Sequence, residues 1–220
     1  MADLPPPEHD GTSVVLLGSF NPKIFQPAWF AAQKLLPPEE GTEANVQVIG
    51  NDVCLFETDW FRLEVLSERW SLQSQSTPAV GAIRDLALGT FRILRHTPIT
   101  RIGLNTFGHF ALGSPEQFDA FGHALAPKEQ MWEPILESPG TLSLTVHGER
   151  PDDYKGHIRV KVEPSSSVTN GIFIETNEEF RQTDATSADW TTEILHREWE
   201  AYRHRANQIR AHLLQQAKDL

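Results

Sequence analysis

The sequence has only one cysteine, Cys54, among its 220 residues. A single cysteine excludes an internal disulfide framework, so the fold does not depend on the cross-links that stabilise small secreted proteins. No apolar run is long enough to span a bilayer, and the chain opens on Met1-Ala2-Asp3-Leu4 and three prolines instead of a basic and then apolar signal pattern. We therefore expect a cytoplasmic protein that does not contact a membrane.

The common catalytic and nucleotide-binding motifs are also missing. The sequence has no G-x-x-x-x-G-K-[ST] or G-x-G-x-x-G loop, no C-x-x-C pair, no H-E-x-x-H helix and no G-x-S-x-G turn. These absences exclude the commoner strand-loop-helix nucleotide-binding and hydrolase classes, although an unusual site stays open. The sequence predicts no cofactor.

Positive charge is scarce, because 19 Lys and Arg face 30 Asp and Glu and the net charge is -11. A molecule of that sign repels a phosphate backbone on average, which disfavours a general nucleic-acid binder but leaves local basic patches open. The remaining composition, 39% hydrophobic and 22% charged, is that of an ordinary globular protein. A chain of this length buries enough apolar surface to fold without metals or disulfides.

Hydrophobic periodicity predicts the secondary structure. Residues 1–12 are proline-rich and read as a flexible lead-in, and residues 13–220 read as one α+β domain. The expected strands are 13–20, 46–48, 53–55, 61–65, 70–72, 99–107, 142–146, 158–162 and 172–174. The expected helices are 23–36, 77–94, 114–125, 128–136 and one long helix over 187–218.

The order strand, helix, meander, helix thus occurs twice, in halves 13–97 and 98–220. Two such β-α-β(3-4)-α halves are expected to join into one antiparallel sheet with the helices on one face and a long C-terminal helix. This arrangement looks like the duplicated saddle of the TATA-binding-protein-like class.

Two segments carry a further resemblance, Ile99-Thr100-Arg101-Ile102-Gly103-Leu104-Asn105 and Ile172-Phe173-Ile174-Glu175. Together with the residue pattern of the segment 52–105, they resemble a sporadically distributed bacterial family of uncharacterised proteins. The chain departs from that family at Asn105, where the family more often shows arginine. The resemblance implies a bacterial protein from a mobile or defence-type gene set that acts with partners, and it implies no catalytic residues.

Strand parity predicts an exposed sheet face. If Leu63, Leu104 and Val160 face the helices, the opposite side carries a mainly cationic set. The predicted binding residues on it are Arg62, Arg101, Asn105, His147, Arg159 and Lys161, with Glu64 and His157 beside them. Such a face suits an anionic partner or ligand, and the alternative is a solvated face with cross-strand ion pairs.

For the other candidate functional residues, the sequence favours a structural role or a place at an interface. His196, Glu200 and His204 share a helix face, but the two histidines are about 12 Å apart along the axis, so no metal site is predicted. Cys54, between Val53 and Leu55, reads as a buried core residue. Trp60 and Trp70 bracket a strand at turn positions and are candidates for partly exposed interface anchors.

Three hypotheses follow. The first is a non-enzymatic protein-interaction component of a bacterial cytosolic complex, of a defence type, that binds a protein partner through the open sheet face or the terminal helix. The second is a binder of a small anionic ligand or a nucleic-acid segment on the same face. The third is an enzyme with His109 or His147 as acid-base group. The sequence leaves the oligomeric state open.

Overall fold

The computed structural model describes residues 5–74, 79–183 and 187–220. The first half of the chain contains β1 (His9–Gly18), a 3-10 turn (Pro22–Ile24), α1 (Pro27–Ala32), α2 (Pro38–Glu43), β2 (Asn45–Ile49), β3 (Val53–Glu57), β4 (Phe61–Leu66), β5 (Arg69–Ser74) and α3 (Val80–Ile93). The second half contains β6 (Ile99–Ala111), α4 (Pro115–Leu125), β7 (Leu144–Glu149), β8 (His157–Pro164), β9 (Gly171–Arg181), α5 (Asp189–Arg197) and α6 (Trp199–Lys218). Each half therefore runs strand, helix, meander, helix, as the sequence predicted.

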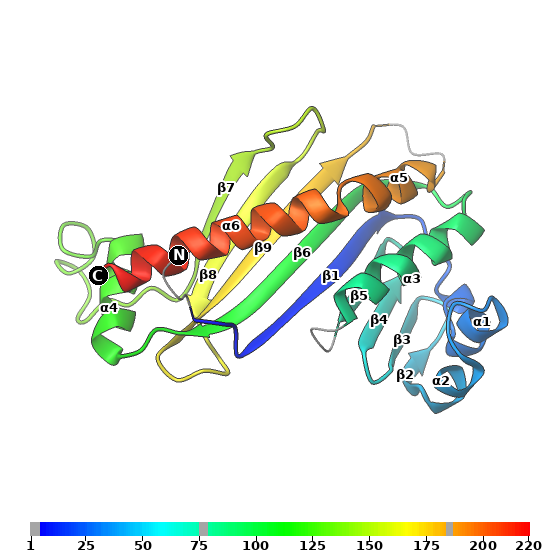
Figure 1. Cartoon of the computed structure of the whole chain (residues 1–220), viewed down its shortest axis with the longest axis horizontal. Coiled ribbons are helices and arrows are strands. Elements are labelled where there is room, and N and C mark those ends of the chain that lie inside the picture. The colour runs from blue at the N-terminus through cyan, green and yellow to red at the C-terminus, as the bar shows by residue number, and fades with distance from the viewer. Residues whose placement is uncertain (1–4, 75–78, 184–186) are drawn as a thin grey trace.

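The described strands form one antiparallel sheet in the order β2-β3-β4-β5-β1-β6-β9-β8-β7. The first strand of each half, β1 and β6, form the central pair, in which Val14 lies opposite Leu104. On both sides of this pair, the meander of each half runs outward from its last strand to its first. The two halves are thus joined into one sheet by a single strand pairing at its centre (Figure 1).

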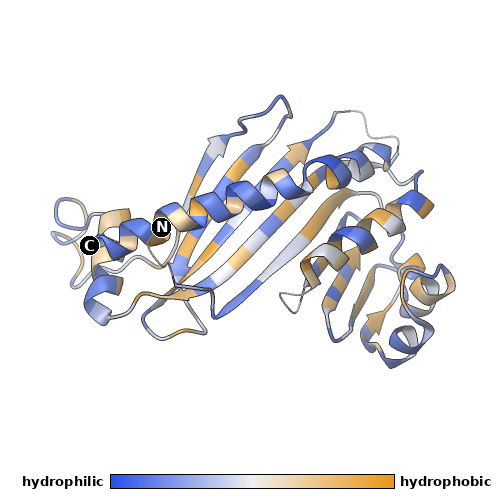
Figure 2. Ribbon diagram, viewed as in Figure 1, coloured by the Kyte–Doolittle hydropathy of each residue, from blue (hydrophilic) through white to orange (hydrophobic). Residues whose placement is uncertain are grey.

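One face of the sheet carries the helices and the core. Val14 and Leu104, in register with Leu72 of β5, lie in a buried cluster with Trp199 and Tyr202 of the C-terminal helix. At the other end of α6, Phe121 of α4 packs in a second cluster with strand residues of the same parity. Figure 1 shows α3 and α6 crossing in front of the strands, and Figure 2 shows α6 mostly hydrophilic over strands of alternating hydropathy. The architecture is α+β, with the helices on one face.

The first strand, the segment after Pro37 and residues 128–136 differ from the sequence-based expectation. β1 begins at His9, inside the expected lead-in. α2 was missed because Pro37-Pro38 was taken as a stop, although proline is favoured at the first position of a helix, as Pro38 is here. Residues 128–136 form turns, not a helix, and their apolar side chains, among them Met131 and Ile135, are exposed, so no tertiary packing stabilises helical backbone there. The expected opening of the third helix, Thr77-Pro78, lies outside the described residues.

The long C-terminal helix is divided. α5 ends and α6 begins at Glu198, whose backbone is nearly helical with φ -97° and ψ -7°. The next residue, Trp199, is buried and its ring lies 5.2 Å from that of Tyr202. The bend at Glu198 therefore lets α5 pack against α3 while α6 crosses the centre of the sheet.

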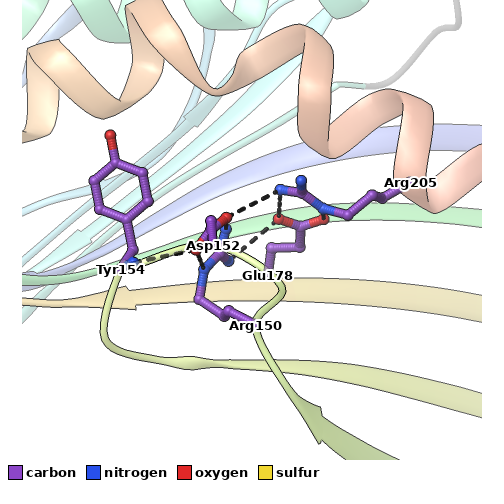
Figure 3. A network of polar contacts seen from close by, with 5 residues as sticks. All are labelled: Arg150, Asp152, Tyr154, Glu178 and Arg205. Atoms are coloured by element: carbon purple, nitrogen blue, oxygen red, sulfur yellow. Dashed lines mark hydrogen bonds and ion pairs between the residues drawn. The ribbon is translucent and has the colours of Figure 1, made fainter.

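A buried ion network ties the β7–β8 connection to the sheet and to α6 (Figure 3). Glu178 of β9 is fully buried and accepts two hydrogen bonds from Arg205, at 2.8 and 2.7 Å. Arg150 lies 3.2 Å from the same carboxylate and donates to Asp152 at 2.9 and 2.6 Å. Asp152 in turn accepts from the backbone N–H of Tyr154. Two guanidinium groups and two carboxylates balance one another, as buried charges require.

Among the described residues, none of the helices combines the length and the apolar character that crossing a membrane needs.

Candidate functional site

The side of the sheet opposite the helices is the candidate site, and we call it the open face. Side chains alternate between the two faces along each strand. The open face consists of the strand residues in register with Ser13 and Asn105 and of the residues two and four positions away from them on the same strand. Their partners of the other parity, such as Val14 and Leu104, form the core beneath the helices. Among the described helices, α1, α3, α4, α5 and α6 contribute residues to the core on that side, and α2 packs against α1, so no described helix covers the open face.

A single register row of polar residues, which we call the polar row, crosses the open face from one edge to the other. Its members, one from each strand, are Asn45, Glu57, Arg62, Gln73, Ser13, Asn105, Asn177, Arg159 and His147. Four of the six predicted binding residues therefore lie in one line. Lys161 is two residues from Arg159, and Arg101 is four residues from Asn105, on the same face.

The centre of the polar row is a chain of amide hydrogen bonds across three strands. Asn177 donates from Nδ2 to Asn105 Oδ1 at 2.5 Å, and Asn105 donates from Nδ2 to Ser13 Oγ at 3.0 Å. Asn105 is 9% exposed and Ser13 is 8% exposed, so this part of the polar row is buried. Asn177 Oδ1 has no hydrogen-bond partner among the described residues. The chain of amide hydrogen bonds thus includes one buried acceptor, Asn177 Oδ1, that the described residues leave unsatisfied.

Glu179 brings together arginines from three strands. Arg159 of β8 donates to its carboxylate at 2.7 Å, and Arg181 of β9 contacts the other oxygen. Burial alone would raise the pKa of the Glu179 carboxyl, but the hydrogen bond from Arg181 and the charges of Arg181, Arg159 and Arg101 outweigh it and lower that pKa. Glu179 therefore stays ionised and anchors two of the predicted binding residues.

The sequence did not reveal Glu179 or Asn177. The apolar pattern of β9 fades after Ile174, so the strand was expected to end there, while it continues to Arg181. Beyond Ile174 the helix-facing positions are Thr176 and Glu178, which are polar and buried. A periodicity based on apolar residues could not detect this part of the strand.

The predicted excess of positive charge on the open face is not there. The cations are Arg62, Arg69, Arg101, Arg159, Lys161 and Arg181, and the carboxylates are Glu57, Glu64, Glu149, Glu163, Glu175 and Glu179. The six cations and six carboxylates cancel. Several are paired in the structure: Arg62 lies 2.6 Å from Glu57, and Lys161 lies 3.2 Å from Glu163. The prediction failed because it left out acidic residues of the same parity on β3, β7, β8 and β9.

Arg101 differs from the other arginines of the open face. It is exposed, and it has no carboxylate within 4 Å among the described residues. Its strand neighbours in register are Leu17 and Arg181. Arg101 is thus a guanidinium whose hydrogen-bond donors are available to a partner.

Aromatic rings gather at one end of the open face. Phe107 and Phe173 lie with ring centroids 6.2 Å apart, and the His109 ring lies 4.9 Å from Phe173. Burial, and after it the charge of His9, lowers the pKa of His109. The hydroxyl of Ser165 lies 2.8 Å from His109 Nδ1, and it accepts two backbone N–H groups of its own turn. The two backbone hydrogen bonds give Ser165 a turn-forming role.

Three other candidates have structural surroundings. Cys54 is buried, donates to the carbonyl of Phe25 at 3.0 Å, and has its pKa raised to about 11 by burial, so its thiol is not reactive. Trp70 is fully buried against Phe91, which contradicts the expectation of partial exposure. Trp60 is half-buried, with its indole N–H donating to a carboxylate of α2 at 2.8 Å.

No metal site emerges from the described part of the chain, in which no three His, Cys, Asp or Glu side chains converge as ligands. Glu200, between the two histidines of the helix face considered above, instead lies 3.5 Å from Arg203. His147, the other candidate acid-base group, is exposed at the sheet edge with its ring 5.7 Å from that of His157.

A cavity of about 590 Å³ lies on the helix side, between α4 and the ends of β8 and β9. Its walls are mainly apolar and include Phe118, Phe121 and Ile172. The nearest cation, Lys128, donates to the carbonyl of Gly122 at 2.8 Å. The ammonium therefore caps the C-terminal end of α4, where it satisfies orphan carbonyls.

A scan against protein-family models finds no match to the chain, and a comparison with curated proteins finds none either.

Proposed function

We propose that this protein is a non-enzymatic interaction component whose open face binds a protein partner. The observation that carries the proposal is a nine-stranded face that no described helix covers and whose charges cancel, in a molecule of net charge -11. A large, charge-balanced surface of this kind is complementary to another protein surface that carries charges of both signs. The polar row would provide the hydrogen bonds at its centre.

The residue types of the open face support this proposal. The face has five arginines against one lysine, and two phenylalanines, Phe107 and Phe173, lie at one end. Arginine and aromatic residues are enriched at the energetic centres of protein interfaces, where lysine is depleted. Glu179 holds the guanidinium group of Arg159 in a fixed position, which lowers the entropy that this side chain would lose on binding.

The second hypothesis, an anionic ligand or a nucleic-acid segment on the same face, receives less support. Six carboxylates share the face, and one of them, Glu179, already neutralises Arg159 and Arg181. A phosphate backbone would have to approach these carboxylates as well as the arginines, which costs binding energy.

We further propose that the protein acts in a bacterial cytoplasmic complex of a defence type. This part of the proposal rests on the resemblance of residues 99–105 and 172–175 to the sporadically distributed bacterial family. The central pairing of β1 with β6, with the meander of each half outside it, supports the likeness to the TATA-binding-protein-like saddle. In such a saddle the uncovered face is the natural place for a partner.

The test is a reversal of charge on the open face. Arg101→Glu changes an exposed residue without removing an ion pair of the fold, and Arg92→Glu makes the same change on α3, on the helix side. The tagged wild type and both variants are used to capture partners from cells that produce the protein, and the affinity of the captured partner is then measured with purified components. We expect Arg101→Glu to weaken that affinity by about tenfold or more, and Arg92→Glu to leave it within about twofold.

Arg159→Glu gives a second variant of the open face, provided that its unfolding midpoint shows a folded protein. A partner that binds wild type, Arg101→Glu and Arg159→Glu equally would place the interface elsewhere. A lone monomer from its native cells, in every capture, would contradict the interaction role itself.

A further inference from the structure

A small polar cavity lies between α6 and the central strands, on the side opposite the open face. It has a volume of about 100 Å³ and is lined by Asp10, Thr12, Tyr202, Arg203, Asn207 and Arg210, among others. A water molecule needs about 10–15 Å³ of such space, so the cavity has room for a group larger than one water. Its walls come from β1, β6, the start of α3 at Val80 and α6.

Arg210 is the main reason to expect an anion in this cavity. Its side chain belongs to a residue that is only 8% exposed, and one of its terminal nitrogens donates to the carbonyl of Phe107 at 3.3 Å. Its Nε has no hydrogen-bond partner among the described residues. A guanidinium cannot release its proton near neutral pH, so burial leaves a cation that lines the cavity and has one unused donor, Nε.

The charged side chains that line the cavity are two cations, Arg203 and Arg210, and one carboxylate, Asp10. Arg203 also lies 3.5 Å from Glu200, outside the lining, and the field of Asp10 favours the charged form of Arg210. Burial nevertheless lowers the pKa of Arg210 overall, against the opposing influence of Asp10 and Tyr202. The hydroxyls of Thr12 and Tyr202, 2.5 Å apart, and the amide of Asn207 add neutral polar groups to the same walls.

We propose that this cavity binds a small tetrahedral oxyanion, of the size and charge of inorganic phosphate. The buried guanidinium would supply charge-assisted hydrogen bonds, and Asn207 would close the solvent side. A volume near 100 Å³ suits a free ion and is too small for a nucleotide. The site is separate from the open face, so it does not depend on the function proposed above.

Thermal unfolding in sodium phosphate and in sodium chloride, at the same pH and ionic strength, tests the proposal. A ligand that binds only the folded state raises the midpoint, and at tenfold excess over Kd the expected rise for a chain of this size is about 3 °C or more. The rise should saturate with phosphate concentration. A phosphate effect no larger than that of chloride would overturn the proposal.

Two isosteric substitutions locate the effect. Asn207→Asp adds a negative charge at the cavity wall on an exposed residue, so the protein should fold while phosphate no longer raises the midpoint. Gln208→Glu makes the same change of charge on the next residue, which is exposed and not part of the cavity lining, and the phosphate effect should remain. Equal phosphate effects in both variants would show binding elsewhere on the surface and would also overturn the proposal.

Discussion

At the scale of single residues, the carboxylate of Glu178 is a buried charge that depends on its ion-pair partners. It is fully buried, and two guanidinium groups, from Arg150 and Arg205, lie within 3.2 Å of it. Glu178→Gln keeps the shape but leaves the two cations with one carboxylate, Asp152, in place of two. Removing one partner of a buried ion pair typically costs about 3–5 kcal/mol, so we expect a loss of about 3 kcal/mol in the free energy of unfolding, measured by urea denaturation.

The matched control for this substitution is Glu175→Gln on the same strand. Glu175 lies on the open face, is half-buried and has no basic side chain within 4 Å among the described residues. Glu175→Gln should therefore change the free energy of unfolding by no more than about 0.5 kcal/mol. If both variants lose the same free energy of unfolding, the ion network of Figure 3 does not stabilise the fold as expected.

Sequence patterns placed the predicted open-face residues correctly by parity but did not predict their chemistry. Arg62, Asn105 and Arg159 lie on the expected side because alternation in β4, β6 and β8 is unambiguous. Their partners depend on which strand lies beside which, and local alternation carries no such information. The pairing of Arg159 with Glu179 joins residues 20 positions apart across a register that only the folded sheet defines.

At the scale of elements, the β7–β8 connection depends on one glycine. Gly156 has φ +143°, and a Cβ there would lie 1.9 Å from the carbonyl oxygen of Glu179. Gly156→Ala must therefore move the connection away from β9 and adopt a backbone conformation that side chains disfavour. We expect a loss of about 2 kcal/mol or more in the free energy of unfolding, together with faster hydrogen exchange at Arg181, whose N–H donates to the carbonyl of Lys155.

Gly148→Ala, on the adjoining strand β7, controls for the loss of glycine itself. A Cβ at Gly148 meets no atom within 4 Å, and its backbone is not left-handed. This variant should stay within about 0.5 kcal/mol of wild type. Equal losses in the two variants would mean that close packing at residue 156 is not the cause.

The elements best predicted from sequence are those whose local signals and tertiary packing agree. At α4 the predicted N-cap, Ser114, accepts from the N–H of Gln117, and Pro115 occupies the first helical position. Residues 128–136 have a helical pattern, but their apolar side chains face solvent, and the pattern alone does not sustain a helix. The division at Glu198 escaped prediction because the apolar stripe continues through it, from Leu195 to Trp199.

At the scale of the whole molecule, the two halves share a core although each repeats the same order of elements. α6 belongs to the second half, but it lies over the central strands, where the hydroxyl of Tyr202 is 2.5 Å from that of Thr12 in the first half. Thr12 also donates to the carbonyl of Asn105 at 2.8 Å. The pairing of β1 with β6 joins the halves within the sheet, and these contacts beneath α6 join them on its helix side.

Because the core is shared, we expect the halves to unfold in one transition. Trp70 reports on the first half and Trp199 on the second, and both are buried. Variants that retain only one of these tryptophans, with the others replaced by phenylalanine, should give urea midpoints by fluorescence that agree with each other and with far-UV circular dichroism within about 0.3 M. Tyr202→Phe, which removes one buried hydroxyl, should lower both midpoints together by an amount equivalent to about 1 kcal/mol. Separate midpoints, or a Tyr202→Phe effect confined to the Trp199 probe, would show that the halves are independent units that only touch at β1 and β6.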